Sequence, residues 1–273
     1  MPEAHIELAR AKVNLTLHIG ALRADGYHDL ESLVVFADIG DEIQLSSADL
    51  PSLTIEGEED LSSGPDNLIN RALEFCEAEP HHIHLKKILP VSAGLGGGSA
   101  NAAAIIRRFK SEKSDHDLAF GLGADVPVCR YSKTSIMSGI GERIEHLPNL
   151  GSLSAVLVNP GVSVSTGEIF KAMDKAPDGK PMNLTSRKGD LLSRALSGGN
   201  DMQKFAIVQV PIISDVLRIL SQQTACQLAR MSGSGATCFG IFRSDAQAQN
   251  ATKVIQEIYP NWWVRSCRIG DTT

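Results

Sequence analysis

Apolar and polar positions alternate along the first part of the chain, which is typical of strands that bury one face. The alternation runs through residues 6–19, and residues 29–36 and 42–45 continue it. An Asp-Gly turn within residues 23–26 separates the first stretch from the next. Because Asp-Gly favours a tight reversal of the chain, the pattern predicts antiparallel pairing between these strands.

Further along, runs with helical spacing are interspersed with short apolar runs. The predicted helices cover 67–77, with Asp66 as the capping residue, and then 101–109, 167–173, 211–223 and 245–258. The predicted strands cover 83–89, 154–160, 236–242 and 262–269. Strands and helices mix without the regular alternation of a parallel sheet, so the predicted fold class is α+β.

A break in the pattern predicts two domains. Residues 148–152 have the composition of a linker, and a new apolar run follows them. The 273 residues of the chain suit such a division. We therefore predict an N-terminal domain at 1–150 and a C-terminal domain at 151–273. Residues 174–188 are rich in Pro, Gly, Lys and Asp, which is typical of a surface loop.

Four glycines lie within the five positions 94–98, and Ser99 and a run of good helix formers follow them. A loop with so few side chains lets its backbone N–H groups converge on an anion. The helix that begins after the loop directs its unpaired N–H groups and its positive dipole end toward the same place. The loop therefore predicts a phosphate site, with a nucleoside triphosphate as the ligand.

Two better-known phosphate loops do not fit this sequence. Ser99 occupies the position of the third glycine in the dinucleotide-binding fingerprint. The only Gly-Lys pair, at 179–180, is followed by Pro181 instead of the Ser or Thr of a Walker loop. A plain turn between a strand and a helix is the remaining alternative for the glycine cluster.

Composition narrows the class of partner. The chain has 42% hydrophobic residues, 21% charged residues and a net charge of −6, as in an ordinary globular protein. The negative charge argues against a nucleic-acid or anionic membrane surface, and no apolar run approaches the length of a membrane span. The N-terminal residues lack the basic and apolar regions of a signal peptide, so we expect a cytoplasmic protein.

Three separated motifs together resemble one family. The first is Lys-Val-Asn-Leu-Thr-Leu-His at 12–18, followed by Arg-Ala-Asp-Gly-Tyr-His at 23–28. The second is the glycine loop, and the third is Met-Ser-Gly-Ser-Gly-Ala at 231–236. In this order they resemble the kinase superfamily named for galactokinase, homoserine kinase, mevalonate kinase and phosphomevalonate kinase. The resemblance extends over nearly the whole chain.

The resemblance implies an ATP-dependent kinase. Its N-terminal domain would be a ribosomal-protein-like ATP-binding domain, and its C-terminal domain would be ferredoxin-like and would bind the substrate. The string at 23–28, together with Leu-Gly-Ala-Asp-Val-Pro at 122–127, narrows the resemblance to members whose substrate is a cytidine-diphosphate-linked methylerythritol. These members phosphorylate the 2-hydroxyl of that alcohol in the non-mevalonate synthesis of isoprenoid precursors.

The same resemblance implies two catalytic residues. Phosphoryl transfer needs positioning, charge neutralisation and a group that accepts the proton of the acceptor hydroxyl. Asp125 would be that general base, and Lys12 would stabilise the developing charge beside it. On the residues alone, Asp125 is better explained as a turn former, and Lys12 would be a solvated strand lysine.

The predicted ATP site comprises the glycine loop and its neighbours. Its members are Lys87, Pro90, Gly94, Leu95, Gly96, Gly97, Gly98, Ser99 and Asn101. Ser99 is also the candidate Mg²⁺ ligand, because Ala100 stands where the family usually has a second serine. The interval from Asn101 to Asp125 is also shorter than is usual in the family, so the polar stretch 110–117 replaces a helix or a helix is lost.

The predicted substrate site draws on all three motifs. Asn14 lies two residues after Lys12 on a predicted strand, so both side chains face the same side. The resemblance implies that Tyr27 and Phe170 sandwich a cytosine ring and that His28 reads its edge. Gly233 and Ser234 complete the predicted site. Core packing of Phe170 and a turn-flanking Tyr27 are the alternatives that the residues alone favour.

Two other functions stay open. The chain could be another kinase of the superfamily, acting on homoserine or mevalonate. It could also be a catalytically inactive nucleotide-binding regulator, which Ala100 and the short interval before Asp125 would support. In every case the expected partner is a small molecule, and the expected assembly is a monomer or a weak homodimer.

Overall fold

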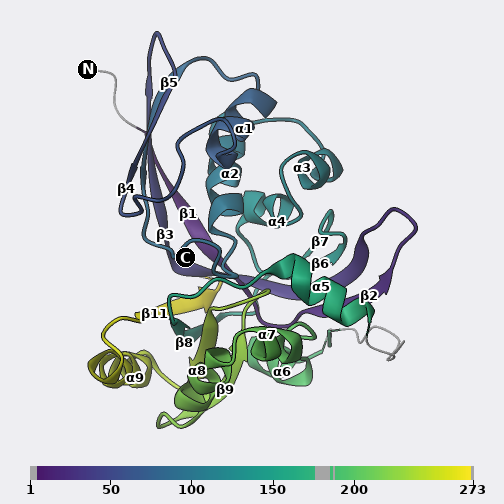
Figure 1. Ribbon diagram of the computed structural model, residues 1–273, viewed down its shortest axis with the longest axis vertical. Coiled ribbons are helices and arrows are strands. Elements are labelled where there is room, and N and C mark those ends of the chain that lie inside the picture. The colour runs from purple at the N-terminus through teal and green to yellow at the C-terminus, as the bar shows by residue number, and fades with distance from the viewer. Residues whose placement is uncertain (1–4, 176–184, 187, 272–273) are drawn as a thin grey trace.

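The computed structural model describes residues 5–175, 185–186 and 188–271 of the chain. Most of the loop that the sequence predicts at 174–188 therefore lies outside the described residues. Helices and strands mix along the chain (Figure 1), so the predicted α+β class is confirmed.

Eleven strands of the described chain form one sheet. They are β1 (His5–Asn14), β2 (His18–Leu22), β3 (His28–Ser47), β4 (Ser52–Glu56), β5 (His81–Lys86), β6 (Ser135–Gly139), β7 (Arg143–His146), β8 (Ser152–Asn159), β9 (Cys226–Met231), β10 (Cys238–Phe242) and β11 (Trp263–Gly270). The predicted domain boundary near residue 150 falls between β7 and β8.

The long strand β3 joins the two halves of the sheet. It pairs antiparallel with β1, β2, β5 and β6, and its Ala37 pairs with Ile269 of β11. From β11 the sheet continues through β8 and β10 to β9. Residues 31–37 of β3 are all buried, because this part of the strand is covered on both faces.

An irregularity in the pairing of β1 with β3 lies close to this junction. Arg10 pairs with Gly40 and Lys12 pairs with Phe36, so residues 37–39 of β3 all stand opposite Ala11. Extra residues on one strand bend it and increase its twist. The bend occurs where β11 joins, and it precedes Lys12 and Asn14 on β1.

The helices cover the two halves of the sheet separately (Figure 1). They are α1 (Leu68–Phe75), α2 (Gly97–Arg108), α3 (Asp115–Gly121), α4 (Val126–Tyr131), α5 (Thr166–Asp174), α6 (Leu191–Ser197), α7 (Gln203–Gln209), α8 (Ile212–Ser221) and α9 (Asp245–Ile258). Among the described residues, no helix has the length and apolar character needed to cross a bilayer.

Three hydrophobic clusters follow from this arrangement. One lies between α2 and the strands β1, β3 and β5, and includes Phe36 and Ile105. A second lies under α8 and α9, which pack on β8, β9, β10 and β11, and includes Val216 and Ile255. The third includes Leu33 of β3 and Phe239 of β10, and therefore links the two halves.

Several predicted boundaries are wrong. The N-cap of α1 is Asn67 rather than Asp66, since the Asn67 side chain accepts a hydrogen bond from the Ile69 N–H. Helix α2 begins at Gly97 rather than Asn101, because the turn is completed at Gly96. The polar stretch 110–117 leads into α3, which Ser114 and Asp117 begin with a capping box.

Other predictions misjudged continuity. The alternating stretch 6–19 is interrupted after Asn14 and forms both β1 and the start of β2. The stretches 29–36 and 42–45 are parts of the single strand β3. The sequence patterns did not reveal β4, β6, β7, β9, α3, α4, α6 or α7. These short elements depend on pairing and packing with distant parts of the chain.

Candidate active site

The glycine loop leads into α2 as the sequence predicts for a phosphate site. Gly96 is the N-cap with a left-handed φ of 64°, and no side chain caps the helix. The first turn of α2 contains no acidic residue. The N–H groups of Gly97, Gly98 and Ser99 therefore have no intrahelical acceptor and can bind an anion.

Steric contacts require glycine in this loop. Gly94 has a φ of 75°, and a Cβ atom there would lie 2.3 Å from the Ser232 carbonyl oxygen. The Ser232 hydroxyl donates to the Gly94 carbonyl at 2.9 Å, and the Thr237 N–H donates to the Ala93 carbonyl at 3.1 Å. The third motif of the sequence thus holds the second in place, although the two lie far apart along the chain.

Lys12 and Asp125 meet beside the glycine loop. The Lys12 ammonium lies 2.8 Å from the Asp125 Oδ2 atom and donates to the Asn14 Oδ1 atom at 2.7 Å. The Lys12 N–H donates to the Leu95 carbonyl at 2.8 Å, and a Cβ atom on Gly96 would lie 3.0 Å from the Lys12 Cε atom. Strand β1 therefore presents its ammonium directly against the start of α2.

Asp125 precedes α4 but does not cap it with its side chain. Its carboxylate pairs with Lys12 and stays 30% exposed, so it can reach a bound molecule. Burial, and secondly the charge of Asp125, raise the pKa of the nearby Cys129 thiol to about 12. That thiol stays protonated at neutral pH, and Asp125 is the base that the geometry offers.

A cavity of about 250 Å³ opens beside the glycine loop. Its lining includes Lys87, Pro90, Gly97, Gly98 and Asn101, as well as Leu61, Asn67 and Leu68, which the sequence did not indicate. The Asn101 side chain is buried, and its Oδ1 atom has no hydrogen-bond partner within the described chain. A ligand with a polar donor would satisfy that atom.

Lys87 is held by a residue that sequence reasoning missed. The Lys87 ammonium forms a buried ion pair with the carboxylate of Asp41 on β3. The other Asp41 oxygen accepts from the N–H groups of Ile88 and Leu89, at 2.8 and 2.9 Å. Asp41 therefore fixes Lys87, the residue after β5, beside Gly97. A Cβ atom on Gly97 would lie 3.4 Å from the Lys87 Nζ atom.

The aromatic residues of the predicted nucleobase site contact other rings in the structure. Phe170 of α5 stacks on the His28 ring, with 4.9 Å between centroids and 14° between planes. Tyr27 instead packs edge-on against Phe120 of α3, with 5.6 Å between centroids. Each of the two rings thus contacts another aromatic neighbour, and the sandwiching of a cytosine between Tyr27 and Phe170 stays a prediction.

His28 is anchored through its Nδ1 atom, and its Nε2 atom lies close to a carboxylate. Its Nδ1 atom lies 3.0 Å from the Gly20 carbonyl oxygen, and its Nε2 atom lies 3.1 Å from the Asp174 Oδ1 atom. The carbonyl can only accept, so the Nδ1 atom carries a proton. The ring is thereby fixed under Phe170.

Gly233 and Ser234 lie between the two halves of the site. The Gly233 carbonyl accepts from the Asn200 side chain at 2.8 Å, and the Ser234 hydroxyl accepts from Thr166 of α5 at 2.8 Å. A Cβ atom on Gly233 would lie 3.4 Å from the Asn14 Oδ1 atom. The turn is therefore adjacent to the residues around Lys12.

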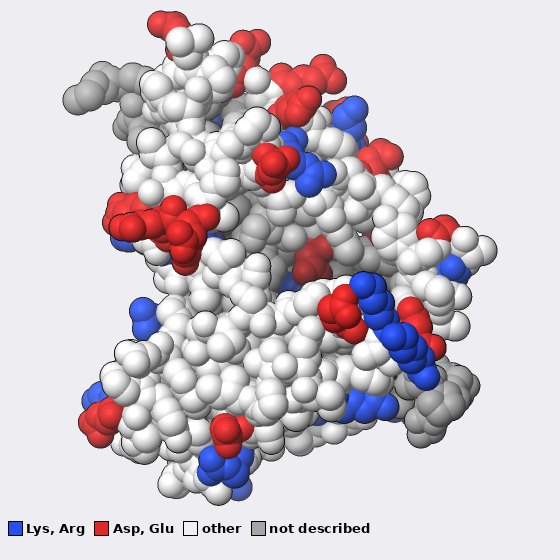
Figure 2. All heavy atoms as spheres, viewed as in Figure 1, with Lys and Arg blue, Asp and Glu red and all other residues white. Residues whose placement is uncertain are grey.

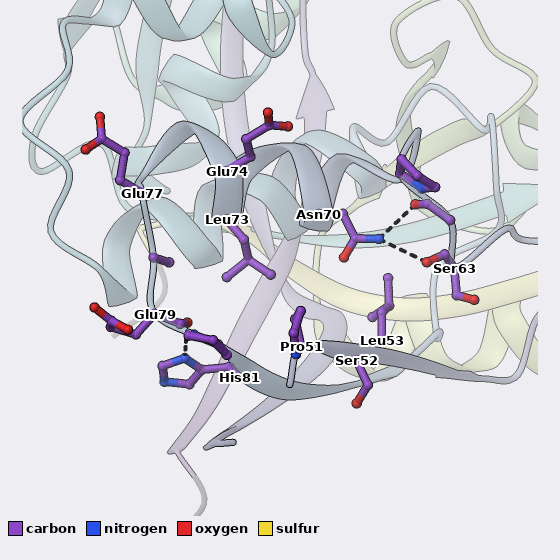
Figure 3. A pocket seen from close by; sticks show the side chains of 14 residues that line it. Pro51, Ser52, Leu53, Ser63, Asn70, Leu73, Glu74, Glu77, Glu79 and His81 are labelled. Carbon is purple, nitrogen blue, oxygen red and sulfur yellow. Dashed lines mark hydrogen bonds between the residues drawn. The ribbon is translucent and has the colours of Figure 1, made fainter. Parts of the chain in front are cut away.

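The site lies apart from a larger cavity of about 630 Å³. That cavity lies between α1 and the edge strand β4, where Leu73 points toward Pro51 and Leu53 (Figure 3). Glu74, Glu77 and Glu79 are among its lining residues, and none of the predicted site residues is. Figure 2 shows a hollow between the two halves of the molecule, and acidic side chains are visible on its wall.

Similarity to known proteins agrees with these observations. The models described as GHMP kinases N terminal domain and GHMP kinases C terminal match residues 67–132 and 183–261. The chain is 41% identical to 4-diphosphocytidyl-2-C-methyl-D-erythritol kinase of Roseobacter denitrificans, over 99% of this chain and 95% of that protein. This chain belongs to the GHMP kinase family.

Further relatives support the same membership. This GHMP kinase is 43% identical to 4-diphosphocytidyl-2-C-methyl-D-erythritol kinase of Dinoroseobacter shibae, over 94% of this chain and 92% of that protein. It resembles a solved structure of 4-(cytidine 5'-diphospho)-2C-methyl-D-erythritol kinase with a TM-score of 0.80 and 28% identity, over 98% of this chain and 100% of that one. The predicted two-domain kinase fold and family are thus confirmed.

Family membership fixes the general reaction of this GHMP kinase as phosphoryl transfer from ATP to a small molecule. Sequence reasoning missed Asp41, Asn67, Ser32 and Phe120, which contact or support predicted site residues. A buried acidic residue needs a partner, but Asp41 is one of several acidic residues in β3, and the sequence did not indicate which of them is buried.

Proposed function

We propose that this GHMP kinase transfers the γ-phosphoryl group of ATP to the 2-hydroxyl of 4-diphosphocytidyl-2-C-methyl-D-erythritol. The products are the 2-phosphate and ADP, and the reaction belongs to the non-mevalonate synthesis of isoprenoid precursors. The observation that carries the proposal is the Lys12–Asp125 pair, 2.8 Å apart, beside an uncapped helix that begins with glycines. The names of relatives at about two-fifths identity over nearly the whole chain supply the substrate.

Each part of the proposed site has its own role in binding or catalysis. The N–H groups at the start of α2 bind the phosphates of ATP, and Lys87, Pro90 and Asn101 line the adjoining cavity for the rest of the nucleotide. Asp125 takes the proton of the substrate 2-hydroxyl as that oxygen attacks the γ-phosphorus and the bond to the β–γ bridging oxygen breaks. Lys12 stabilises the negative charge that develops between them.

Mg²⁺ would neutralise charge on the β- and γ-phosphates. Ser99, in the first turn of α2 and partly exposed, can offer its hydroxyl oxygen there. The described residues contain no group of three or more His, Cys, Asp or Glu side chains that could hold a metal. This donor set fits Mg²⁺, which is usually held by few protein oxygens together with waters and phosphates.

The substrate is held from both halves of the chain. We assign ATP binding and catalysis to residues 1–150 and most substrate contacts of the second half to Phe170, Gly233 and Ser234. His28 and Phe170 present a preformed stack to the cytosine, and Tyr27 closes on its open face after leaving Phe120. Asn14 faces the acceptor alcohol from beside Lys12.

The deciding experiment measures ADP release by the purified protein. With 4-diphosphocytidyl-2-C-methyl-D-erythritol as acceptor, ADP should form in proportion to the phosphorylated product, which mass spectrometry identifies. Homoserine and mevalonate serve as competing acceptors, and turnover on either in preference to the cytidyl alcohol would overturn the substrate. ATP binding without turnover on any acceptor would indicate a regulator instead.

We also propose that the enzyme is cytoplasmic and acts as a monomer or a weak homodimer, with no nucleic-acid or membrane partner. The net charge of −6 supports the absence of an anionic polymer as partner. Light scattering after size-exclusion chromatography, across a range of concentrations, would reveal a mass that stays near one chain or rises toward two. A stable larger assembly would contradict this part of the proposal.

A further inference from the structure

Behind the Lys12–Asp125 pair lies a buried row of polar side chains. Lys12 donates to the Asn14 Oδ1 atom at 2.7 Å, and the Asn14 Nδ2 atom donates to the Ser32 hydroxyl at 2.7 Å. The Ser32 hydroxyl in turn donates to the Thr16 carbonyl at 2.5 Å. Asn14 and Ser32 are buried, so water does not compete for these bonds.

The direction of each bond in this row is fixed by chemistry. A carbonyl oxygen can only accept, so the single Ser32 proton must point to Thr16. The Ser32 oxygen therefore turns its lone pairs toward Asn14 and can receive only the NH₂ end of the amide. The carbonyl end of the Asn14 amide must then face Lys12, which is the orientation that an ammonium donor requires.

The reversed amide would damage the site. It would place the Asn14 NH₂ group against the Lys12 ammonium, so two donors would meet without an acceptor in a buried place. Lys12 would lose its fixed partner on β1 and, with it, its aim at Asp125. The Asn14 main chain cannot correct this, since its N–H already donates to the Ser232 hydroxyl at 3.1 Å.

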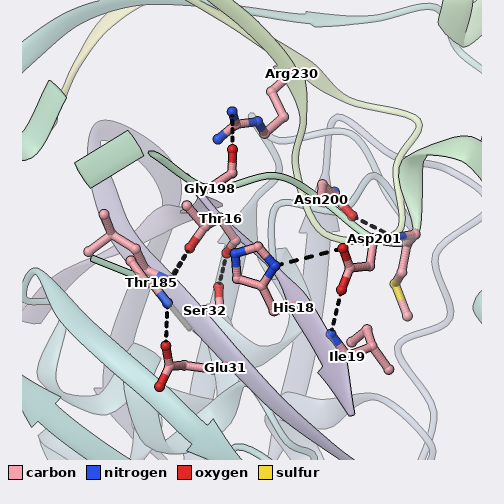
Figure 4. A network of polar contacts seen from close by, with 12 residues as sticks. Thr16, His18, Ile19, Glu31, Ser32, Thr185, Gly198, Asn200, Asp201 and Arg230 are labelled. Carbon is pink, nitrogen blue, oxygen red and sulfur yellow. Dashed lines mark hydrogen bonds and ion pairs between the residues drawn. The ribbon is translucent and has the colours of Figure 1, made fainter. Parts of the chain in front are cut away.

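The surroundings of Ser32 on β3 hold it rigidly. The next residue, Leu33, donates its N–H to the Thr16 hydroxyl at 3.0 Å, and the preceding Glu31 accepts from the Thr185 N–H at 2.6 Å. The Thr16 and Thr185 hydroxyls lie 2.7 Å apart (Figure 4). Three consecutive residues of β3 thus tie the end of β1 to the second half of the chain.

We propose that Ser32 is a positioning residue that sets the orientation of the Asn14 amide and thereby directs the Lys12 ammonium at Asp125. This inference rests on the proposed function, because it assigns Lys12 and Asp125 to phosphoryl transfer. Ser32 is fully buried and forms its hydrogen bonds with Asn14 and Thr16. Its effect passes through Asn14 alone.

The main test replaces Ser32 by Ala, which removes both the acceptor for Asn14 and the donor to Thr16. We expect kcat to fall at least tenfold, while KM for ATP stays within about twofold, because the phosphate loop is untouched. Ser32→Cys leaves no cavity, since sulfur is somewhat larger than oxygen, but it offers only a weak acceptor. Ser32→Cys should also lower kcat while leaving KM for ATP nearly unchanged. It replaces Ser32→Ala in the test if that variant folds poorly.

Ser135→Ala is the matched control. Ser135 is also fully buried on a strand, and its hydroxyl donates to the Lys133 carbonyl at 2.8 Å and lies 3.0 Å from the His146 Nδ1 atom. Its loss should reduce stability without changing kcat. If Ser32→Ala and Ser32→Cys retain the kcat of Ser135→Ala, Ser32 has no positioning role.

A double-mutant cycle isolates the route through Asn14. Asn14→Ala should lower kcat, and adding Ser32→Ala to it should lower kcat no further, because the amide to be oriented is already gone. Additive losses in the double variant would show that Ser32 acts by another route and would overturn the proposal.

A readout independent of turnover separates this inference from the proposed function. In NMR spectra, the Asn14 side-chain NH₂ protons should exchange slowly with water in the wild type and faster in Ser32→Ala, with no such change in Ser135→Ala. An unchanged exchange rate would overturn the inference whatever the substrate proves to be. Absence of turnover by the wild type on the cytidyl alcohol, with the exchange behaviour as expected, would overturn only the function.

Discussion

Lys12 and Asn14 are 3% and 1% exposed, whereas Tyr27, at the rim of the same proposed site, is 47% exposed. The centre is built from hydrogen bonds of fixed direction and from glycines that no other residue could replace without a clash. The rim is built from ring contacts, Phe170 on His28 and Tyr27 on Phe120. Buried polar networks tolerate few alternatives, whereas exposed rings can change partners at small cost.

This difference between centre and rim matches the two tasks that the proposed function assigns to them, catalysis at the centre and binding of the base at the rim. The centre must hold a base, an ammonium and the phosphates to within a fraction of an ångström, because small displacements reduce the rate steeply. The rim needs only to select a flat, polar ring and release it. We therefore expect substitutions at the centre to lower kcat or stability strongly, and substitutions at the rim to raise KM moderately.

The largest effect is expected for Asp125→Asn at the centre. Turnover should fall by about 10²- to 10⁴-fold, because the amide cannot take the proton of the acceptor hydroxyl. The Kd for ATP, measured by calorimetry, should change little. Asp215→Asn, which alters an exposed carboxylate on α8, is the control and should keep full turnover. Wild-type turnover in Asp125→Asn would remove Asp125 from the role of base.

Gly94→Ala and Gly161→Ala form a pair that isolates the contact between the second and third motifs. Both positions have nearly the same φ, 75° and 76°, but a Cβ atom would meet the Ser232 carbonyl at Gly94 and open space at Gly161. Backbone strain should lower the free energy of unfolding by about 1 to 2 kcal/mol in both variants. The overlap at Gly94 should cost a further 1 to 3 kcal/mol, roughly, and weaken ATP binding. If urea unfolding shows equal decreases in the free energy of unfolding for the two variants, the loops at Gly94 accommodate the Cβ atom without a further loss of stability.

At the rim, Phe170→Ala should raise KM for the cytidyl alcohol by roughly tenfold to a hundredfold, because stacking of a base on an aromatic ring is worth about 1 to 3 kcal/mol. The value of kcat should fall much less. Tyr259→Ala, which breaks a stacked pair with Trp262 on the C-terminal side of α9, is a control of similar chemistry. A lowered kcat with unchanged KM in Phe170→Ala would place Phe170 outside the base site.

Phe120→Ala sharpens the comparison within the rim. Phe120 holds Tyr27 away from His28 and Phe170 in this structure, and it lies on α3, which Arg71 anchors by donating to the Gly121 carbonyl at 2.6 Å. Its loss should change KM for the cytidyl alcohol by only a few-fold, since an aromatic pair contributes about 0.5 to 1.5 kcal/mol. A change as large as that of Phe170→Ala would make Phe120 a direct wall of the base site.

The smallest expected effect is a pH-dependent change in stability at the start of β2, where Asp201 contacts His18 and Ile19. Burial alone raises the pKa of Asp201, but the neighbouring His18 and the Ile19 N–H, which donates at 2.9 Å, outweigh it and hold the pKa below its usual value (Figure 4). A lowered pKa stabilises the fold above the usual value of about 4 and loses this contribution as the pH falls through the folded-state value.

Asp201→Asn should therefore lower the free energy of unfolding near neutral pH by a few tenths of a kcal/mol to about 1 kcal/mol, given its partial exposure. The difference from the wild type should shrink as the pH falls below about 4. Urea unfolding across this range measures it, with the exposed Glu257→Gln as control. A difference that grows in acid would mean that the fold raises the pKa of Asp201 instead of lowering it.

The glycine cluster could be found in the sequence because its composition alone predicts an anion site, whereas Lys12 and Asp125 were indicated only by the family resemblance. Asn14 followed from strand alternation relative to Lys12, and the structure joins them by a hydrogen bond. Asp41 and Ser32 could not be found in this way. Both lie in the long strand β3, whose sequence mixes apolar and polar residues, and their partners, Lys87 and Asn14, are distant in sequence.

The ring contacts at the rim also could not be predicted from the sequence. The sequence indicated Tyr27, His28 and Phe170 as one group, yet it could not decide which rings would touch. Phe120 competes for Tyr27 because α3 forms within a stretch that the patterns left without a helix. Ring contacts of similar strength are decided by which neighbours the fold brings within reach.

The sequence by itself predicted the proposed phosphate loop, because glycines act through their own backbone and the following helix supplies its N–H groups locally. It also determined the α+β class and the kinase family, which depend on patterns along the chain. Only the tertiary structure decided which buried partners aim Lys12, hold Lys87 and separate Tyr27 from Phe170. These contacts join residues far apart in sequence. They form because a buried polar group without a partner would lower the stability of the fold.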